Sequence, residues 1–219
     1  MLVYLAAPMG AGVMGASYIG TSEDDTVHGT EGDDTINPIG GDDIVYGQGG
    51  DDFLAGDDGD DTLIGGAGID TMYGGDGDDL LSDAEGANSW MYGGDGADRL
   101  ISSGPGQGSQ LSGDAGNDLL VVEQGRFFDM QGGAGDDVLL AEGVYGTMTG
   151  GEGADVFVPG TDPNGGVYPY PTLATVTDFD PAEDTMVVRL SGTALPEDFW
   201  LTEDSTGTLS LMTNQLEGV

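Results

Sequence analysis

The amino-acid sequence predicts an all-β protein in which parallel strands wind into a solenoid. Three observations lead to this fold class. Residues 56–82 repeat a nine-residue unit three times in succession, with glycine at position 1 of every unit. Each unit has an aspartate at position 6, and each has a large apolar residue at position 8. An apolar side chain that returns with the same period in successive units indicates repeated strands of one shape.

Each part of the unit has a physical role. Glycine adopts positive φ angles without steric cost, so positions 1–6 form a tight turn. In the three-residue strand that follows, the middle side chain points to one face and the outer two point to the other. Hard cations such as calcium bind carboxylate and carbonyl oxygens, and the aspartate at the end of the turn supplies the carboxylate. The unit therefore predicts metal-binding turns around an apolar core, with two units in one coil.

The repeat keeps its register from residue 20 onward. The inward-facing residues at position 8 are Val27, Ile36, Val45, Leu54, Leu63, Met72 and Leu81. After Ser82 only every second unit keeps its glycines and its aspartate. The units between them still carry an inward residue, namely Met91, Leu111, Met130 and Met148. The core is therefore expected to continue where the metal turns stop.

Because two units make a coil, alternate turns fall on opposite edges of the solenoid. The first edge carries an aspartate in every coil: Asp25, Asp43, Asp61, Asp79, Asp98, Asp118, Asp137 and Asp155. The second edge carries Asp34, Asp52 and Asp70, followed by irregular turns at 84–89, 102–109, 122–128 and 141–146. The predicted metal ligands are the aspartates of both edges from Asp34 onward. With them we place the glycines that open the turns: Gly56, Gly65, Gly74, Gly93, Gly113, Gly132 and Gly150.

In-phase copies of this nonapeptide resemble the RTX (repeats-in-toxin) family of hemolysin-type calcium-binding repeats, over roughly residues 20–158. The resemblance implies a right-handed parallel β-roll in which calcium lies between consecutive turns, held by aspartate carboxylates and turn carbonyls. Eight turns on the first edge leave seven gaps and three turns on the second leave two, so we expect at most about nine Ca²⁺ ions. The resemblance to the RTX family also implies that the chain leaves bacteria unfolded through type I secretion and folds in external calcium. It therefore predicts an extracellular location.

Two further segments flank the predicted β-roll of residues 20–158. Residues 1–19 are apolar, and they are either a terminal strand that closes the first coil or a signal or membrane anchor. Residues 159–219 are expected to form a small β-rich cap, because an open solenoid end exposes core and unpaired strand edges. Within this segment, Asp178-Phe-Asp-Pro-Ala-Glu-Asp184 resembles the element that closes the solenoid in many RTX proteins.

The composition excludes several function classes. The chain has 41 acidic residues against three basic ones and a formal net charge of −38, so nucleic acids and anionic membranes are poor partners and no membrane insertion is expected. Without cations, repulsion among the carboxylates opposes folding, and we therefore expect calcium binding and folding to be coupled. The absence of cysteine excludes disulfides and thiolate metal sites.

We predict that the chain is not an enzyme. It has one histidine, His28, so a His-Glu-x-x-His zinc site cannot form. It also lacks a Gly-x-Ser-x-Gly nucleophile motif. The metal turns account for nearly all of the carboxylates that could otherwise form an acid/base pair.

The irregular turns leave an alternative function open. They are either turns that lost their metal or a recognition edge over residues 84–148 of an extracellular adhesin that binds a glycan or a protein. The bulky side chains on which this alternative depends are Trp90, Tyr92, Arg126, Phe127, Phe128 and Tyr145.

A row of aliphatic side chains is also predicted on the outer face of one sheet. It comprises Leu80, Leu119, Val121, Val138, Leu140, Val156 and Val158. A row of this length would be an interaction surface if it were exposed, and we expect the C-terminal segment to cover it.

Overall fold

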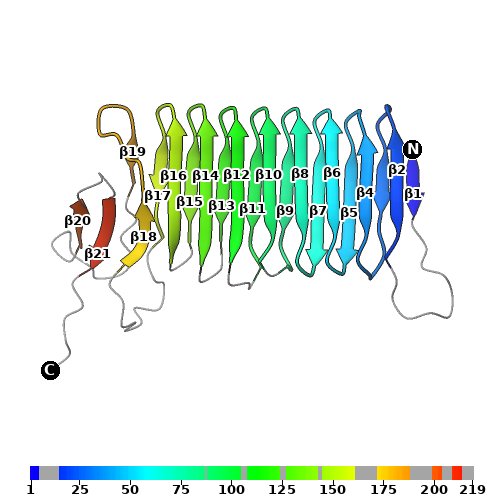
Figure 1. The fold of residues 1–219 in the computed structure, drawn as a ribbon, viewed down its shortest axis with the longest axis horizontal. Helices are drawn as coiled ribbons and strands as arrows, with labels where there is room; N and C mark the ends of the chain where they lie inside the picture. The colour runs from blue at the N-terminus through cyan, green and yellow to red at the C-terminus, as the bar shows by residue number, and fades with distance from the viewer. Residues whose placement is uncertain are drawn as a thin grey trace, which may run out of the picture.

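The structure, a computed structural model, describes residues 1–4, 15–86, 88–104, 108–123, 127–142, 145–160, 172–187, 199–203 and 209–213. These residues form strands and turns, and they contain no helix long and apolar enough to cross a membrane. The strands belong to two sheets that run the length of the molecule (Figure 1). The predicted all-β fold with parallel strands is confirmed, and the architecture is that of a parallel β-roll.

The odd-numbered strands up to β19 form the first sheet, in sequence order. They are β1 (Leu2–Tyr4), β3 (Thr26–His28), β5 (Ile44–Gly49), β7 (Thr62–Ala67), β9 (Leu80–Asp83), β11 (Arg99–Ser102), β13 (Leu119–Val122), β15 (Val138–Ala141), β17 (Val156–Val158) and β19 (Thr185–Met186). Neighbouring strands are parallel and pair in register, so that Leu120 lies opposite Leu100 and Leu139.

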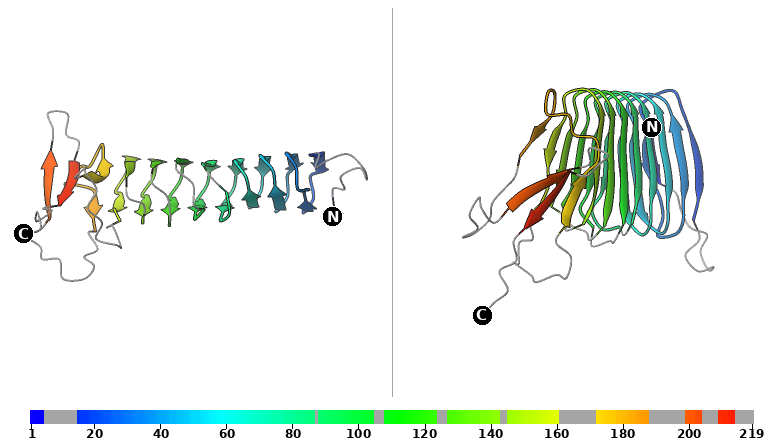
Figure 2. Two further views of the ribbon diagram at one scale, coloured as in Figure 1. Left: turned by 90° about the horizontal axis from the view of Figure 1, so that it is seen from below. Right: turned by 60° about the vertical axis from the view of Figure 1, so that its left-hand side comes forward.

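The even-numbered strands form the second sheet, and the view from below shows the two sheets as two facing rows along the molecule (Figure 2, left). They are β2 (Ser17–Thr21), β4 (Thr35–Ile39), β6 (Phe53–Asp58), β8 (Thr71–Asp76), β10 (Trp90–Asp95), β12 (Ser109–Ala115), β14 (Phe128–Ala134), β16 (Gly146–Glu152) and β18 (Thr172–Val176). Two antiparallel strands, β21 (Leu209–Thr213) and β20 (Phe199–Glu203), extend this sheet beyond β18.

The core is a double column of the side chains predicted to point inward. Each of the position-8 residues from Val27 to Phe157 is at most 1 % exposed. On the second sheet Met91 lies opposite Met72 and Leu111, and Met130 lies opposite Leu111 and Met148. Burial of each such side chain stabilises the fold by roughly 1.5–3 kcal/mol. The column stays continuous beside the irregular turns, as the sequence predicts.

The expectation about the C-terminal segment and the aliphatic row is not met by the part of that segment that the structure describes. Strands β20 and β21 pair with β18, in the sheet opposite to the one that carries the row. Of the row itself, Leu119, Val121 and Val138 are half-buried and Val158 is 7 % exposed. The strands of the first sheet lie only about 4.8 Å apart, so neighbouring side chains cover one another. Residues 161–171 and 188–198 lie outside the described part of the chain.

Candidate metal sites

Aspartates at position 6 form a hydrogen-bonded ladder along the first edge. The backbone N–H of each aspartate donates to Oδ1 of the aspartate one coil further on. The N···O distances lie between 2.6 Å for the pair Asp25–Asp43 and 2.9 Å for the pair Asp137–Asp155. The ladder places one carboxylate of each coil directly against the preceding turn, which keeps the row in line.

On both edges, the second oxygen of most position-6 carboxylates has no hydrogen-bond donor. Oδ2 is buried and without a partner in Asp43, Asp52, Asp61, Asp70, Asp79, Asp98, Asp118 and Asp137. These residues are at most 3 % exposed, so water does not replace the missing donors. Burying a charged oxygen without a partner costs several kcal/mol, and a cation at this oxygen would remove that cost.

The glycine that opens each turn leaves space for this carboxylate. A Cβ atom at Gly56 would lie 2.0 Å from Oδ2 of Asp61 and 2.7 Å from the carbonyl oxygen of Gly74 in the next coil. The same pair of oxygens flanks Gly74, where they belong to Asp79 and Gly93. Carboxylate and carbonyl oxygens therefore converge on one small cradle per turn. Such an all-oxygen ligand set is the one that Ca²⁺ prefers.

The turn backbone also depends on glycine. At Gly59, position 4 of its turn, φ is +127°, and an added Cβ would lie 2.3 Å from the carbonyl oxygen of Gly41. Coils stacked this closely leave no room for a side chain at this position.

Burial changes the acidity of the carboxylates. Desolvation raises the pKa of Asp52, Asp61, Asp79 and Asp137 to about 7. Desolvation likewise raises the pKa of Asp70 and Asp98, to about 6. In each case the hydrogen bond from a backbone N–H acts in the opposite direction. A bound cation would favour the charged form and reverse these shifts.

The described residues contain no cluster of three or more acidic, histidine or cysteine side chains that could hold a metal ion. This agrees with the cradle geometry, because each turn contributes one buried carboxylate and its other inward oxygens are backbone carbonyls. The residues present therefore fit a stacked series of calcium ions better than a single cage of side chains.

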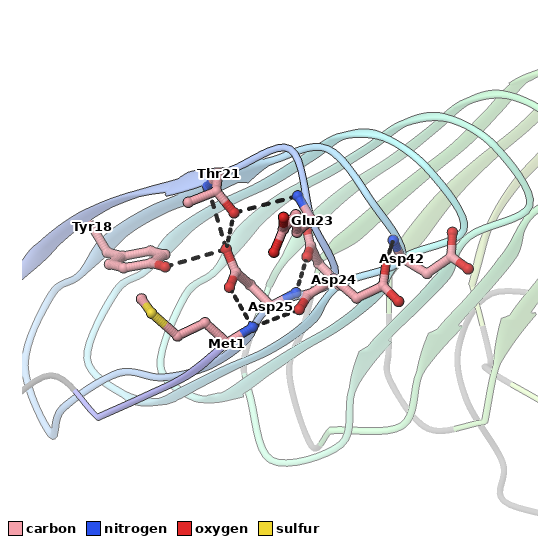
Figure 3. A network of polar contacts seen from close by, with 8 residues as sticks. Met1, Tyr18, Thr21, Glu23, Asp24, Asp25 and Asp42 are labelled. Atoms are coloured by element: carbon pink, nitrogen blue, oxygen red, sulfur yellow. Dashed lines mark hydrogen bonds and ion pairs between the residues drawn. The ribbon is translucent and has the colours of Figure 1, made fainter.

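The first turn differs from the others because its carboxylate already has partners. Oδ1 of Asp25 lies 2.6 Å from the amino group of Met1, and Oδ2 accepts hydrogen bonds from Thr21 and Tyr18 (Figure 3). The hydrogen bond from the Met1 amino group is the main cause that lowers the pKa of Asp25. A cation at this end of the row would therefore gain less, because the charge of Asp25 is already paired.

At the other end, the first row extends beyond the predicted repeat. The backbone N–H of Asp155 donates to Oδ1 of Asp184, at 3.0 Å, although 29 residues separate the two. Asp184 stands before β19 as Asp155 stands before β17, which makes it the position-6 residue of a turn that the sequence analysis did not assign. The sequence signal for this turn is an aspartate directly before the short segment Thr185-Met186-Val187. In that segment Met186 takes the inward position, opposite Phe157. Asp178 of the same turn accepts hydrogen bonds from Gly150 and Gly151.

On the second edge, the row is shorter. The backbone N–H of Asp34 donates to Oδ1 of Asp52, and the backbone N–H of Asp52 donates to Oδ1 of Asp70, with N···O distances of 2.7 and 2.9 Å. Asp34 differs from its neighbours, because both of its carboxylate oxygens accept hydrogen bonds from Thr30. Beyond Asp70 the ladder continues to Ser89 Oγ, which accepts a hydrogen bond from the N–H of Asp70 at 3.3 Å.

The structure does not bring the aromatic residues of the second edge into one surface. Phe128 is 5 % exposed and belongs to the core, whereas Phe127 is 55 % exposed and lies 6.0 Å from the ring of Tyr145. Trp90 and Tyr92 lie on β10, where Tyr92 stacks on Tyr73 of β8 with ring centroids 4.7 Å apart. Arg126 lies outside the described residues. The prediction that Phe128 belongs to an exposed aromatic edge over residues 84–148 is therefore wrong, because the side chain of Phe128 fills the inside of its turn.

Comparison with known proteins gives one family. A family model described as the RTX calcium-binding nonapeptide repeat (4 copies) matches residues 19–54, 40–63, 55–89, 73–104 and 129–143. Residues 105–128 are not matched, and they include most of the irregular turn 102–109 and all of the irregular turn 122–128 of the second edge. No curated protein matches the chain.

Proposed function

The chain carries RTX calcium-binding nonapeptide repeats in residues 19–104 and 129–143, and on this basis we propose that it is a secreted module that folds when calcium binds. Export through bacterial type I secretion and an extracellular location are part of this proposal. A chain with a net charge of −38 stays expanded where calcium is scarce, and it compacts where calcium is abundant.

The observation that carries the proposal is the row of buried carboxylate oxygens without partners. A protein that folded without cations would leave eight such oxygens uncompensated, each at a cost of roughly 1–3 kcal/mol or more. Together these costs are comparable to or larger than the net stability of 5–15 kcal/mol that is typical of a folded domain. Cation binding and folding are then one event.

The assignment of ligands follows from the same geometry. We propose that each ion lies between consecutive turns of one edge, held by the position-6 aspartates and the carbonyl oxygens of the glycines that open the turns. The residues involved are Asp43, Asp52, Asp61, Asp70, Asp79, Asp98, Asp118, Asp137 and Asp155, with Asp34 as the weakest member because Thr30 already occupies its oxygens. At most about nine ions fit the gaps between the turns of both edges, when the first turn, which ends at Asp25, is included.

Circular dichroism in the far ultraviolet during a calcium titration tests the proposal. The expected result is a cooperative gain of β signal in the high micromolar to millimolar range, which is the range of extracellular calcium modules. Magnesium is the control, because it is smaller and demands a stricter octahedral geometry. A chain that is already folded in excess chelator would contradict the proposal.

The alternative of an adhesin rests on fewer residues than the sequence suggested. Among the residues whose exposure the structure describes, the exposed aromatic side chains are Phe53, Tyr73 and Trp90 on the outer face of the second sheet, and Phe127 on the second edge. Binding of cells or glycans that disappears in Phe127→Ala, while the calcium transition is retained, would favour it. The double variant with Phe128→Ala is unsuitable because Phe128 is a core residue.

A further inference from the structure

The inside of the turns changes stepwise along the second edge. In the regular turns, position 1 is glycine and position 6 is aspartate, as in Gly65 and Asp70. In the next three turns the corresponding pairs are Asp83 with Ser89, Ser102 with Ser109, and Val122 with Phe128. All six of these residues are at most 7 % exposed. The space inside the turn thus holds a carboxylate in the regular turns, two hydroxyl groups in the turn 102–109, and hydrocarbon side chains in the turn 122–128.

The turn 83–89 has exchanged the places of its two key residues. Ser89 stands at position 6, and its Oγ accepts the hydrogen bond from Asp70 N–H that an aspartate Oδ1 accepts in the regular turns. Asp83 stands at position 1, where the regular turns have glycine. The hydroxyl of Ser89 donates to Oδ2 of Asp83, and the N–H of Gly86 donates to Oδ1 at 2.8 Å. The turn therefore still contains a carboxylate, supplied from its opposite end.

The hydroxyl of Ser89 links two buried aspartates across the gap before this turn, because it accepts from the N–H of Asp70 and donates to Asp83. Asp70 is 0 % exposed and its Oδ2 has no hydrogen-bond partner. Asp83 is 1 % exposed and lies close enough for its charge to act on Asp70. The hydrogen bonds to Asp83 do not exhaust its oxygens, because an ionised carboxylate offers about four acceptor sites. Two buried carboxylates linked through one serine hydroxyl, one of them with an unpartnered oxygen, are stabilised by a cation.

We propose that a divalent cation binds between turns 65–70 and 83–89, held by Oδ2 of Asp70 and by the carboxylate of Asp83. The inference rests on the proposed calcium function and adds one site to the second edge, beyond the gaps between its regular turns. The hydroxyl pair Ser102 and Ser109, whose Oγ atoms are 2.8 Å apart, supplies no carboxylate and marks the end of the row.

Native mass spectrometry of the calcium-loaded chain tests the site by counting ions. The Asp83→Gly variant restores the regular position-1 residue but removes the carboxylate, and it should bind one ion fewer than the wild type. The control is Asp129→Asn, since Asp129 faces outward from strand β14 and accepts a hydrogen bond from Thr147, so its replacement should leave the count unchanged. A folded Asp83→Gly variant with the full count would overturn the proposal.

The double variant Asp83→Gly/Ser89→Asp keeps the test decisive if the single variant does not fold. It returns the carboxylate to position 6, where the Asp70 N–H already donates, and so restores the glycine and aspartate pair of a regular turn. If the wild type has the site, the double variant binds the same number of ions as the wild type. If the double variant binds one ion more, the wild-type turn holds none and the proposal is wrong. A wild type that binds no calcium would instead refute the proposed function itself.

Discussion

At the scale of single residues, the turns tolerate few side chains at positive φ. Position 2 of the turns carries glycine in many units, but Ile39 occupies it with φ of +89°. A β-branched residue in this region is strained, because its Cβ approaches the following carbonyl at a cost of roughly 1–2 kcal/mol. Ile39 is therefore a local weakness in an otherwise regular turn.

The variant Ile39→Gly should raise the stability of the calcium-loaded protein. The relief of strain exceeds the entropic cost of a glycine, about 0.5–1 kcal/mol, so we expect a net gain of up to about 1 kcal/mol. Urea denaturation at saturating calcium measures it. The control is Ile44→Gly, since Ile44 is similarly exposed (38 % against 40 %) but has no positive φ, and this variant should lose stability. Equal losses in both variants would show that the φ angle does not matter.

At the scale of the turn, glycine at position 1 matters through the carboxylate beside it. The backbone at Gly56 does not adopt a positive φ, so alanine would fit the main chain. The added Cβ would nevertheless lie 2.0 Å from Oδ2 of Asp61. A side chain at Gly56 would therefore displace the carboxylate of Asp61 and disturb the proposed metal site, not the backbone.

We therefore expect Gly56→Ala to shift the calcium-induced folding transition to higher calcium, by several-fold or more. Displacing the carboxylate removes a ligand, and loss of binding energy is loss of folding energy when the two are coupled. The matched control is Gly49→Ala. Its Cβ would have its nearest contact at 3.4 Å, at the end of the Glu31 side chain, and the transition should hardly move. A Gly56→Ala transition that coincides with the wild type would contradict the cradle.

The turn 178–184 acts as the last element of the first row. Asp184 accepts from Asp155 N–H through Oδ1 and from Asp180 N–H, at 2.7 Å, through Oδ2. The N–H of Thr185 donates to the carbonyl oxygen of Asp155, as in the regular coils. This element thus continues the ladder beyond Asp155 and covers the end of the coil.

The variant Asp184→Asn should weaken this closing turn, because it removes the charge that binds two backbone donors. Hydrogen bonds to a charged acceptor contribute roughly 1.5–3 kcal/mol each. We expect faster limited proteolysis of the C-terminal segment at saturating calcium, while the N-terminal coils stay protected. The neighbouring exposed Glu183→Gln is the control and should be cleaved like the wild type. Unchanged cleavage of Asp184→Asn would mean that the ladder ends at Asp155.

At the scale of the whole molecule, protons and calcium compensate the same buried charge. The pKa of Asp52, Asp61, Asp79 and Asp137 in the folded chain is about 7, against roughly 3.9 for an unfolded aspartate. The folded state therefore binds protons more tightly than the unfolded state. Its stability without metal is highest below pH 4 and is lost as the pH rises from about 4 to about 7.

In excess chelator we thus expect the β signal in circular dichroism to increase when the pH is lowered from 7.5 to about 4.5. With calcium present the opposite holds, because protons compete for the carboxylates and acid raises the calcium concentration needed for folding. High salt at pH 7.5 is the control, since it screens surface repulsion but does not satisfy the buried oxygens. A β signal that is independent of pH in chelator would show that the carboxylates do not limit folding.

The sequence by itself determined the all-β solenoid, its apolar column and most of both aspartate rows. It could do so because a constant period places residues 18 apart next to each other, so neighbours in space are known from spacing alone. Where the period changes, this rule no longer holds. Only the tertiary structure brings Asp184 against Asp155, exchanges the roles of Asp83 and Ser89, and separates Phe128 in the core from Phe127 at the surface. In those places backbone geometry and the space inside each turn, not the spacing along the chain, decide which side chains meet.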